Sequence, residues 1–289
     1  MPASKELHTC YVVVVSIDLR KTSTEAVASR VKKTLATDFD SATEVRKRRS
    51  LGYATTRGTW VRIEVRALAR VDGQGWGLET AAVLDGVAMP AWLQGVSWID
   101  HDLGVMWRAD ETERVMDTPI RAGGTLKQNP DLPESWWATF RSSMQALAAH
   151  TMTRTATPHL HPLTQERVSA TIHKLFPAVD TSLTEWRAAH ADLAWANLTA
   201  PNCYFLDWED WGMAPRGWDA ANLWASSFSV PELAERVFEE LRDELDSRTG
   251  KLAQLYHCAE ILSYPPGYAD ELVPLARENA DRLLSDLRA

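Results

Sequence analysis

The spacing of apolar residues changes once along this chain, and that change limits the folds that it can adopt. Up to about residue 107, short runs alternate between apolar and polar residues, which is typical of half-buried β-strands. In the run 59–66, Val61, Ile63 and Val65 share one face and charged residues occupy the other. Beyond residue 130, apolar residues recur at helical spacing. The pattern predicts an α+β protein with a strand-rich first part and a mainly helical second part.

The first part is expected to contain a helix followed by a small sheet. Residues 22–35 have helical spacing, and residues 50–66 form a predicted hairpin whose turn is Arg57-Gly58. Two further strands are expected over Trp92–Ile99 and Leu103–Arg108. The polar run Ala109–Arg114 indicates a connector. We therefore predict an N-terminal domain over 1–115 and a C-terminal domain over 116–289.

The second part is predicted to be a set of amphipathic helices. One begins between Asp131 and Glu134, with Pro133 in its first turn, and carries an apolar stripe. The other predicted helices cover 164–176, 231–248 and 269–288, and Gly250 is expected to end the second of these three. The stretch from 190 to 219 does not follow the helical pattern.

Composition excludes several classes of protein. The 289 residues are 45% hydrophobic, which is enough for a real core, and 31 basic against 39 acidic residues give a net charge of −8. No nucleic acid or anionic membrane is therefore expected as a partner. The apolar run Tyr11–Ile17 is too short to span a membrane, and three scattered cysteines favour a reducing cytosol over a disulfide framework. We expect a cytoplasmic protein, and the sequence does not indicate its oligomeric state.

The irregular stretch places oxygen ligands around a predicted turn. Pro201-Asn202 is flanked by short apolar runs, which indicates a hairpin. If strand pairing is symmetric about residue 202, Asn197 lies opposite Asp207, with Cβ atoms about 4.5–5.5 Å apart. An amide oxygen and a carboxylate side by side can hold Mg²⁺, and Asp192 is then free to face an incoming hydroxyl group. This layout is typical of phosphoryl transfer.

The same residues resemble a known family. The motif His190-x-Asp192-x-x-x-x-Asn197, followed by Asp207-Trp-Glu209 and then by Gly217-Trp-Asp219, is similar to the aminoglycoside phosphotransferase and choline kinase-like branch of the protein-kinase-like fold. The close resemblance covers residues 188–224. It implies a two-lobed protein-kinase-like fold, with a small antiparallel-sheet N-lobe that binds the nucleotide and a mainly helical C-lobe that carries the catalytic and acceptor sites.

The resemblance also implies a role for each motif residue. Asp192 would be the catalytic base, and Asn197 and Asp207 would be the metal ligands. Asp219 would be the buried acid that braces the catalytic loop, and His190 would support that loop. The reaction implied is transfer of the γ-phosphate of ATP or GTP to a hydroxyl group of a small molecule, with Mg²⁺ as cofactor.

Such a kinase also needs groups that hold the nucleotide phosphates. The resemblance implies a basic residue on the third strand paired with a helix Glu, and Arg62 and Glu79 are the candidates. Arg66 is the alternative strand residue, and a simple surface pair with Glu64 is the structural alternative for Arg62. No glycine-rich loop precedes the strand. The basic run 46–49 stands there instead, either as a solvated patch or as a phosphate contact.

Four residues after the metal-binding Asp are candidates for the acceptor site. Trp208, Glu209, Asp210 and Trp211 combine acids with aromatic rings, which suits a polar or cationic acceptor such as an aminoglycoside antibiotic; ordinary packing and capping is the alternative. Two other functions stay open. One is a metabolic kinase for choline, homoserine or a sugar, and the other is a kinase-like protein that binds a ligand without catalysis.

Overall fold

The computed structural model of the chain describes residues 17–68, 71, 75–121 and 123–288. These residues form two compact units. Unit 1 contains the described residues of 1–72 together with Gln94–Glu111, and unit 2 contains those of 73–93 together with Thr112–Ala289. Cys10 and the apolar run Tyr11–Ile17, apart from Ile17 itself, lie outside the described residues.

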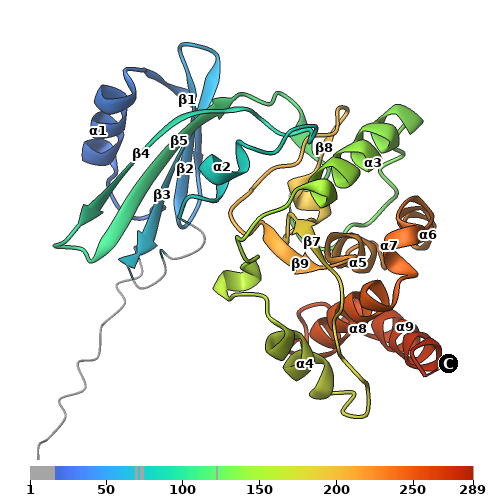
Figure 1. Cartoon of the computed structure of the whole chain (residues 1–289). Helices are drawn as coiled ribbons and strands as arrows, with labels where there is room; N and C mark the ends of the chain where they lie inside the picture. Colours follow the sequence, from blue (N-terminus) through green and yellow to red (C-terminus); the bar gives the residue numbers. More distant parts are fainter. Residues whose placement is uncertain (1–16, 69–70, 72–74, 122, 289) are drawn as a thin grey trace, which may run out of the picture. The chain divides into compact units, whose positions relative to one another are not determined.

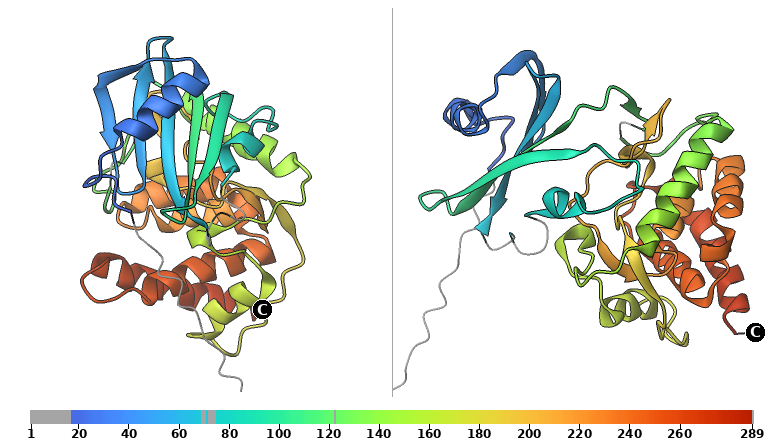
Figure 2. Two further views of the ribbon diagram at one scale, coloured as in Figure 1. Left: turned by 90° about the vertical axis from the view of Figure 1, so that its left-hand side faces the viewer. Right: turned by 45° about the horizontal axis from the view of Figure 1, so that its top comes forward.

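Unit 1 is built on a five-stranded sheet with the strand order β1-β2-β3-β5-β4. The strands are β1 (Phe39–Arg46), β2 (Ser50–Thr55), β3 (Thr59–Ala67), β4 (Trp92–Asp100) and β5 (Val105–Glu113). Strands β2 and β3 pair antiparallel with Ala54 opposite Trp60, so the predicted hairpin is confirmed. Helix α1 (Glu25–Leu35) covers one face of the sheet, where Val31 and Leu35 join the apolar face of β3 in a common core (Figure 2).

The polar run Ala109–Arg114 is not a connector. Through Glu113 it forms the second half of β5, and it is buried as far as Thr112. Its acids are paired: Asp110 accepts from Arg108, and Glu111 accepts from Arg57 at 2.6 Å and from Gln94 at 2.7 Å. Carboxylates with such partners can be buried in a strand, and the polar composition alone does not reveal the partners.

Unit 2 is mainly helical (Figure 1). Its helices are α2 (Gly77–Ala81), α3 (Glu134–Ala149), α4 (Gln165–His173), α5 (Trp218–Ala225), α6 (Pro231–Glu240), α7 (Arg242–Leu245), α8 (Arg248–Leu262) and α9 (Val273–Asp286), with short 3₁₀ segments η2 (Pro158–Leu160), η3 (Trp195–Asn197) and η4 (Asp270–Leu272). Two antiparallel pairs complete it, β6 (Thr118–Pro119) with β8 (Thr199–Ala200) and β7 (Trp186–Ala189) with β9 (Gly212–Pro215). In the described ranges, no helix is both long and apolar enough to cross a membrane. The predicted fold class, a sheet unit followed by a mainly helical unit, is confirmed.

Gly250 does not end a helix, contrary to the sequence prediction. The predicted helix 231–248 breaks at Leu241, and Gly250 lies in the first turn of α8, where its N–H donates to Ser247 Oγ at 2.9 Å. A Cβ at position 250 would overlap the carbonyl oxygen of Glu244. Glycine is therefore needed at position 250 because the backbone of Glu244 passes close to it. The local sequence does not show whether a glycine serves this purpose or ends a helix.

Candidate active site

The segment 190–197 follows β7 and is fixed by the side chain of His190. This imidazole is fully buried, donates from Nε2 to the carbonyl oxygen of Leu206 at 2.8 Å and packs edge-on against Trp208. Its other nitrogen, Nδ1, then accepts from the main-chain N–H of Asp192 at 3.4 Å. Burial lowers the pKa of His190 to about 4, so the ring is neutral at pH 7.

Asp219 also holds this loop, through two main-chain N–H groups. It lies in the first turn of α5, is 4% exposed, and accepts from the main-chain N–H groups of His190 at 2.6 Å and Ala191 at 2.8 Å. Burial raises the pKa of Asp219 to about 6, and the two N–H donors oppose that rise. Trp218 adds a bond from Nε1 to the carbonyl oxygen of Ala191 at 3.4 Å. Together these contacts hold Ala191 at a φ of 69°, in the left-handed region that L-residues seldom adopt.

Asp192 and Asn197 are in direct contact. The Asn197 Nδ2 donates to the Asp192 carboxylate at 3.0 Å and to the Asp192 carbonyl oxygen at 2.8 Å. Burial raises the pKa of Asp192 to about 6; the Asp207 charge adds to the rise and the Asn197 bond opposes it. Because Nδ2 is committed to Asp192, the amide oxygen of Asn197 is the atom that remains for a cation.

The ribbon after Asn197 has a different register from the one predicted. Leu198 lies opposite Phe205, and the N–H of Leu206 donates to the carbonyl oxygen of Asn197 at 2.8 Å. Asn197 is therefore opposite Leu206 and not Asp207. Thr199 pairs with Tyr204, so the turn contains four residues. Pairing that is symmetric about residue 202 would require an odd number of residues between each pair, so the register differs from the predicted one by one residue.

Asp207 nevertheless lies near the catalytic loop. It directly follows Leu206, whose N–H and carbonyl groups bond Asn197 and His190. It adopts a left-handed φ of 65°, and its charge acts on both His190 and Asp192. The structure thus places Asp192, Asn197 and Asp207 in one neighbourhood. The contacts of Leu206 bring them together, and the predicted pairing of Asn197 with Asp207 does not.

The oxygen donors of this neighbourhood suit a hard divalent cation. Asp207 and Glu209 both raise the pKa of Asp192 through their charges, so negative charge is concentrated here. Within the described residues, no group of three or more His, Cys, Asp or Glu side chains forms a metal cluster. A pair of oxygen ligands is what Mg²⁺ takes when water and phosphate complete its shell, so the residues fit that ion.

The acceptor candidates after Asp207 are mostly structural. Trp208 is 1% exposed and donates to the carbonyl oxygen of Phe205, while Trp211 is 3% exposed and donates to that of Gly77. Asp210 is buried and accepts from Thr157 Oγ1. These three side chains are buried and hydrogen-bonded within unit 2, as the packing alternative expects, and a role for them in the acceptor site stays a prediction. Glu209 is half-buried, and its role as an acceptor contact stays a prediction.

The sequence analysis missed Arg154, which organises the segment after Asp207. Its guanidinium donates to the carbonyl oxygens of Trp211 at 2.5 Å and Glu209 at 2.8 Å, and burial lowers the pKa of Arg154. A single arginine in a polar stretch gives no signal of this contact, because its partners are main-chain atoms 55 and 57 residues away.

The predicted nucleotide residues lie in different units. Arg62, on β3 of unit 1, pairs with Glu64, which also pairs with Arg66 at 2.7 Å, as the surface-pair alternative expects. Glu79 lies on α2 of unit 2. An Arg62–Glu79 pair stays a prediction.

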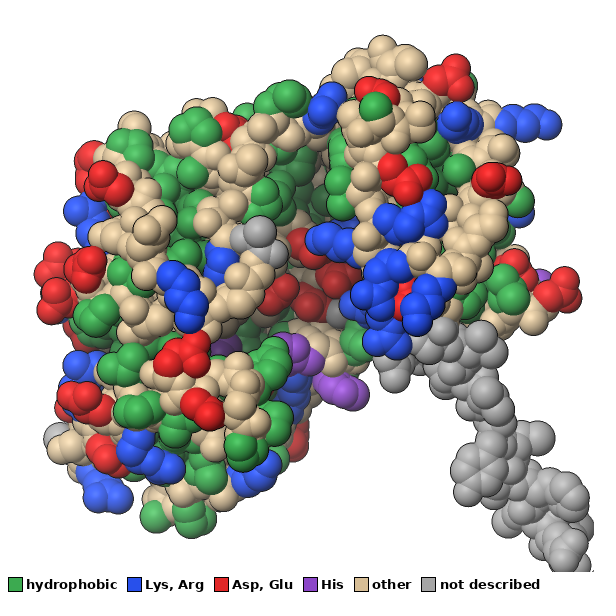
Figure 3. Space-filling model, turned by 180° about the vertical axis from the view of Figure 1, so that it is seen from behind, with side chains coloured by type: hydrophobic (Ala, Val, Ile, Leu, Met, Phe, Trp, Pro, Cys, Tyr) green, Lys and Arg blue, Asp and Glu red, His purple; other side chains and the backbone are tan. Residues whose placement is uncertain are grey.

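The basic run 46–49 covers the last residue of β1, Arg46, and the turn 47–49 between β1 and β2. Lys47, Arg48 and Arg49 are exposed, and Lys and Arg side chains gather on the surface of unit 1 (Figure 3). Arg46 differs from them, because it is half-buried and donates to the carbonyl oxygen of Leu19 at 2.7 Å. Arg46 therefore stabilises the fold, and the other three residues remain the candidates for phosphate contact.

Comparison with solved structures identifies the fold. A choline/ethanolamine kinase family protein from Mesorhizobium loti matches with a TM-score of 0.57 at 14% identity, covering 92% of this chain and 99% of that one. The aminoglycoside phosphotransferase APH(4)-Ia matches with a TM-score of 0.55 at 13% identity and the same coverage. An amicoumacin kinase, solved with AMP-PNP, Ca²⁺ and its ligand, matches at 0.52 and 11% identity, covering 88% and 93%. No protein-family model and no curated protein matches the sequence. The resemblance to aminoglycoside phosphotransferases and choline kinases is confirmed at the level of the fold: the chain has the protein-kinase-like fold of these enzymes.

Proposed function

We propose that this protein is an enzyme that transfers the γ-phosphoryl group of a nucleoside triphosphate to a hydroxyl group of a small molecule. The observation that carries the proposal is the contact of Asn197 with the Asp192 carboxylate, next to Asp207 and on a loop braced by Asp219. This set sits in a fold whose solved examples include small-molecule kinases.

In this proposal Asp192 is the base. Its pKa, raised by burial to about 6, brings its basicity nearer to neutral pH, where a base accepts a proton most effectively. Asn197 orients the carboxylate through Nδ2. Asn197 Oδ1 and the Asp207 carboxylate would hold Mg²⁺, which supplies charge neutralisation for the phosphoryl group when bound. His190 and Asp219 act as positioning residues, since both contact the loop through its main chain.

The nucleotide is ATP or GTP. Similar structures were solved with AMP-PNP and with GDP, and no glycine-rich loop precedes β3 in the sequence to favour either nucleotide. Arg62, assisted by Glu79, is the proposed phosphate contact, with Arg66 or the β1–β2 turn as the alternatives. Arg62→Ala should raise the nucleotide KM more than the acceptor KM. The opposite ranking would point to Arg66 or to the turn.

The acceptor is proposed to be an antibiotic or a related natural product, and the site of action the cytoplasm. Similar structures were solved in complex with hygromycin B and with kanamycin, at 13% and 12% identity, which supports this class of acceptor. A metabolic kinase is the second candidate, because a choline/ethanolamine kinase family protein matches equally well.

A screen of ADP or GDP release tests the proposal. The wild-type protein is assayed with Mg²⁺ against aminoglycosides, nucleoside and peptide antibiotics, choline, homoserine and sugars. Acceptor-dependent release that Asp192→Ala abolishes supports transfer. Saturable acceptor binding without nucleotide turnover would instead identify a non-catalytic binding protein.

A further inference from the structure

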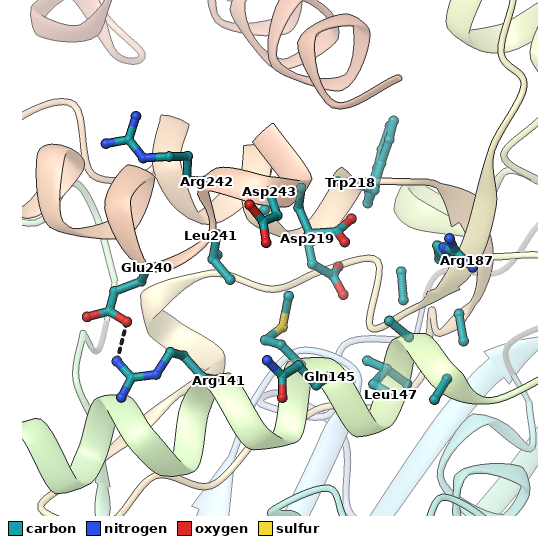
Figure 4. Close-up of a pocket in the computed structure, with 18 of the residues that line it drawn as sticks. Arg141, Gln145, Leu147, Arg187, Trp218, Asp219, Glu240, Leu241, Arg242 and Asp243 are labelled. Carbon is teal, nitrogen blue, oxygen red and sulfur yellow. Dashed lines mark hydrogen bonds and ion pairs between the residues drawn. The ribbon is translucent and has the colours of Figure 1, made fainter. Parts of the chain in front are cut away.

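Unit 2 contains a cavity of about 570 Å³, and Asp219 is one of its lining residues (Figure 4). Its walls come from α3, from β7, from the start of α5 and from the junction between α6 and α7. The volume is in the range of small-molecule sites. Asp192, Asn197 and Asp207 are not among its lining residues, so a ligand here would not occupy the reaction centre.

Acidic side chains outnumber basic ones in this wall. The charged lining residues are Asp219, Glu239, Glu240, Asp243, Glu244, Arg141, Arg187 and Arg242. Most of the acids are already engaged. Glu240 pairs with Arg141 at one end of the cavity and with Arg236 at 2.5 Å, and Glu244 pairs with Arg216 at 3.1 Å.

Asp243 is the acid whose charge is not compensated. Its main-chain carbonyl oxygen accepts from Arg216 at 2.9 Å, but its carboxylate makes no ion pair with any described residue. The residue is exposed and lies on the same side of the cavity as Asp219, across from Gln145 on α3 (Figure 4). A positive group on a ligand would be the natural partner of this carboxylate.

Apart from Gln145, the uncharged side chains of the wall are apolar. Leu147 and Ala148 from α3, Ala188 from β7, and Trp218 and Ala220 from α5 all line the cavity. Such a surface suits a compact hydrocarbon or aromatic group, because binding is favoured when the apolar surfaces of the ligand and the cavity are removed from water. The lining therefore combines the carboxylate of Asp243, which has no ion-pair partner among the described residues, with paired charged groups and an apolar floor.

We propose that this cavity binds a small organic cation, with its protonated nitrogen against Asp243 and its apolar body on the floor between α3 and α5. The ligand would also act on the catalytic loop. Ala188 and Ala189 lead directly into His190, and Asp219 in the same wall accepts the N–H groups of His190 and Ala191. An occupant that packs against these groups reduces opening of the loop.

Benzylamine, benzyl alcohol and benzoate are suitable probes, because they share a ring and differ in charge. In ligand-detected NMR titrations we expect benzylamine to bind the wild-type protein at least about tenfold more tightly than benzyl alcohol. Asp243→Asn should remove this preference and leave the affinity for benzyl alcohol unchanged. Glu235→Gln is the control, since Glu235 is an exposed acid of α6 that does not line the cavity.

Hydrogen exchange provides the second measurement. Benzylamine should slow exchange of the His190 and Ala191 amides in the wild-type protein and not in Asp243→Asn. Equal binding of benzylamine and benzyl alcohol, tighter binding of benzoate, or equal losses in the two variants would overturn the cation site. Binding without slower exchange would overturn its link to the loop. Neither measurement depends on phosphoryl transfer, so the cavity and the proposed function fail independently.

Discussion

The side-chain amide of Asn197 donates to the carboxylate of Asp192 at 3.0 Å, across five positions of the chain. A second bond from the same nitrogen reaches the Asp192 carbonyl oxygen at 2.8 Å. The two bonds fix the loop between these residues and direct one carboxylate oxygen. The proposed base is therefore held in place before any substrate binds, which is the condition for efficient proton transfer.

Replacement of Asn197 tests its two proposed roles, which are to orient the Asp192 carboxylate and to bind Mg²⁺. Asn197→Ala removes both bonds to Asp192 and the proposed amide ligand, so kcat should fall and the Mg²⁺ concentration needed for half-maximal rate should rise. Initial rates over a range of Mg²⁺ concentrations measure both effects. An unchanged Mg²⁺ requirement would show that Asn197 is not a metal ligand.

The brace at Asp219 should contribute to stability as well as to the rate. Asp219→Asn places an NH₂ group against one of the two main-chain N–H donors, and we expect a loss of about 1–3 kcal/mol in the free energy of unfolding. Urea unfolding measures the loss, with the exposed Asp246→Asn as the control. Equal stability of wild type and Asp219→Asn would contradict the brace.

Helix α2 contacts the segment after Asp207 through Gly77 and Trp211, and substitutions at these two residues test the contact. Gly77→Ala adds a Cβ 2.6 Å from the Cα of Glu209, a backbone contact that cannot rotate away, so α2 must shift and stability should fall by about 1–3 kcal/mol. Trp211→Phe keeps most of the ring but removes the donor to Gly77, at a cost of about 1 kcal/mol. A Gly77→Ala protein that melts at the wild-type temperature would rule out this packing.

Buried, neutral His190 predicts a specific dependence of stability on pH. The unfolded chain takes up a proton as pH falls through about 6.5, while the folded chain does so only near its pKa of about 4. The contribution of His190 to the free energy of unfolding is therefore lost progressively as pH falls from about 6.5 to about 4, by up to about 3 kcal/mol.

The comparison is between wild type and His190→Gln, by chemical unfolding at a series of pH values. The raised pKa values of Asp192 and Asp219 act in the opposite direction, but both acids are present in both proteins and cancel in the difference. The wild-type advantage should shrink between about pH 6.5 and 4. A difference that does not change with pH would mean that His190 titrates normally.

The sequence predicted elements where the local pattern is strong. The alternation in 59–66 and the apolar stripe after Pro133 are fixed by burial of one face, and β3 and α3 form there. Long-range partners explain the failures. Asp110 and Glu111 are buried because Arg108 and Arg57 pair with them. Glycine is required at position 250 because the carbonyl group of Glu244 leaves no room for a Cβ.

The candidate site shows the same limit. The order of the motif residues indicated that Asp192, Asn197 and Asp207 belong together, but the connection is one residue shorter than expected, so that Leu206 and not Asp207 lies opposite Asn197. Burial of Trp208 and Trp211 depends on α2 and on the core of unit 2, which adjacent residues do not reveal. Arg154 was missed because main-chain acceptors carry no sequence signature.

The most direct test of the proposed function is transfer of a radiolabelled γ-phosphoryl group to the acceptor that the screen identifies. Wild type and Asp192→Asn are compared with Mg²⁺ present, at matched folded fractions. We expect a labelled acceptor with wild type and a kcat lower by roughly 10²–10⁴-fold with Asp192→Asn. Label transfer at the wild-type rate by Asp192→Asn would contradict the assignment of Asp192 as the base.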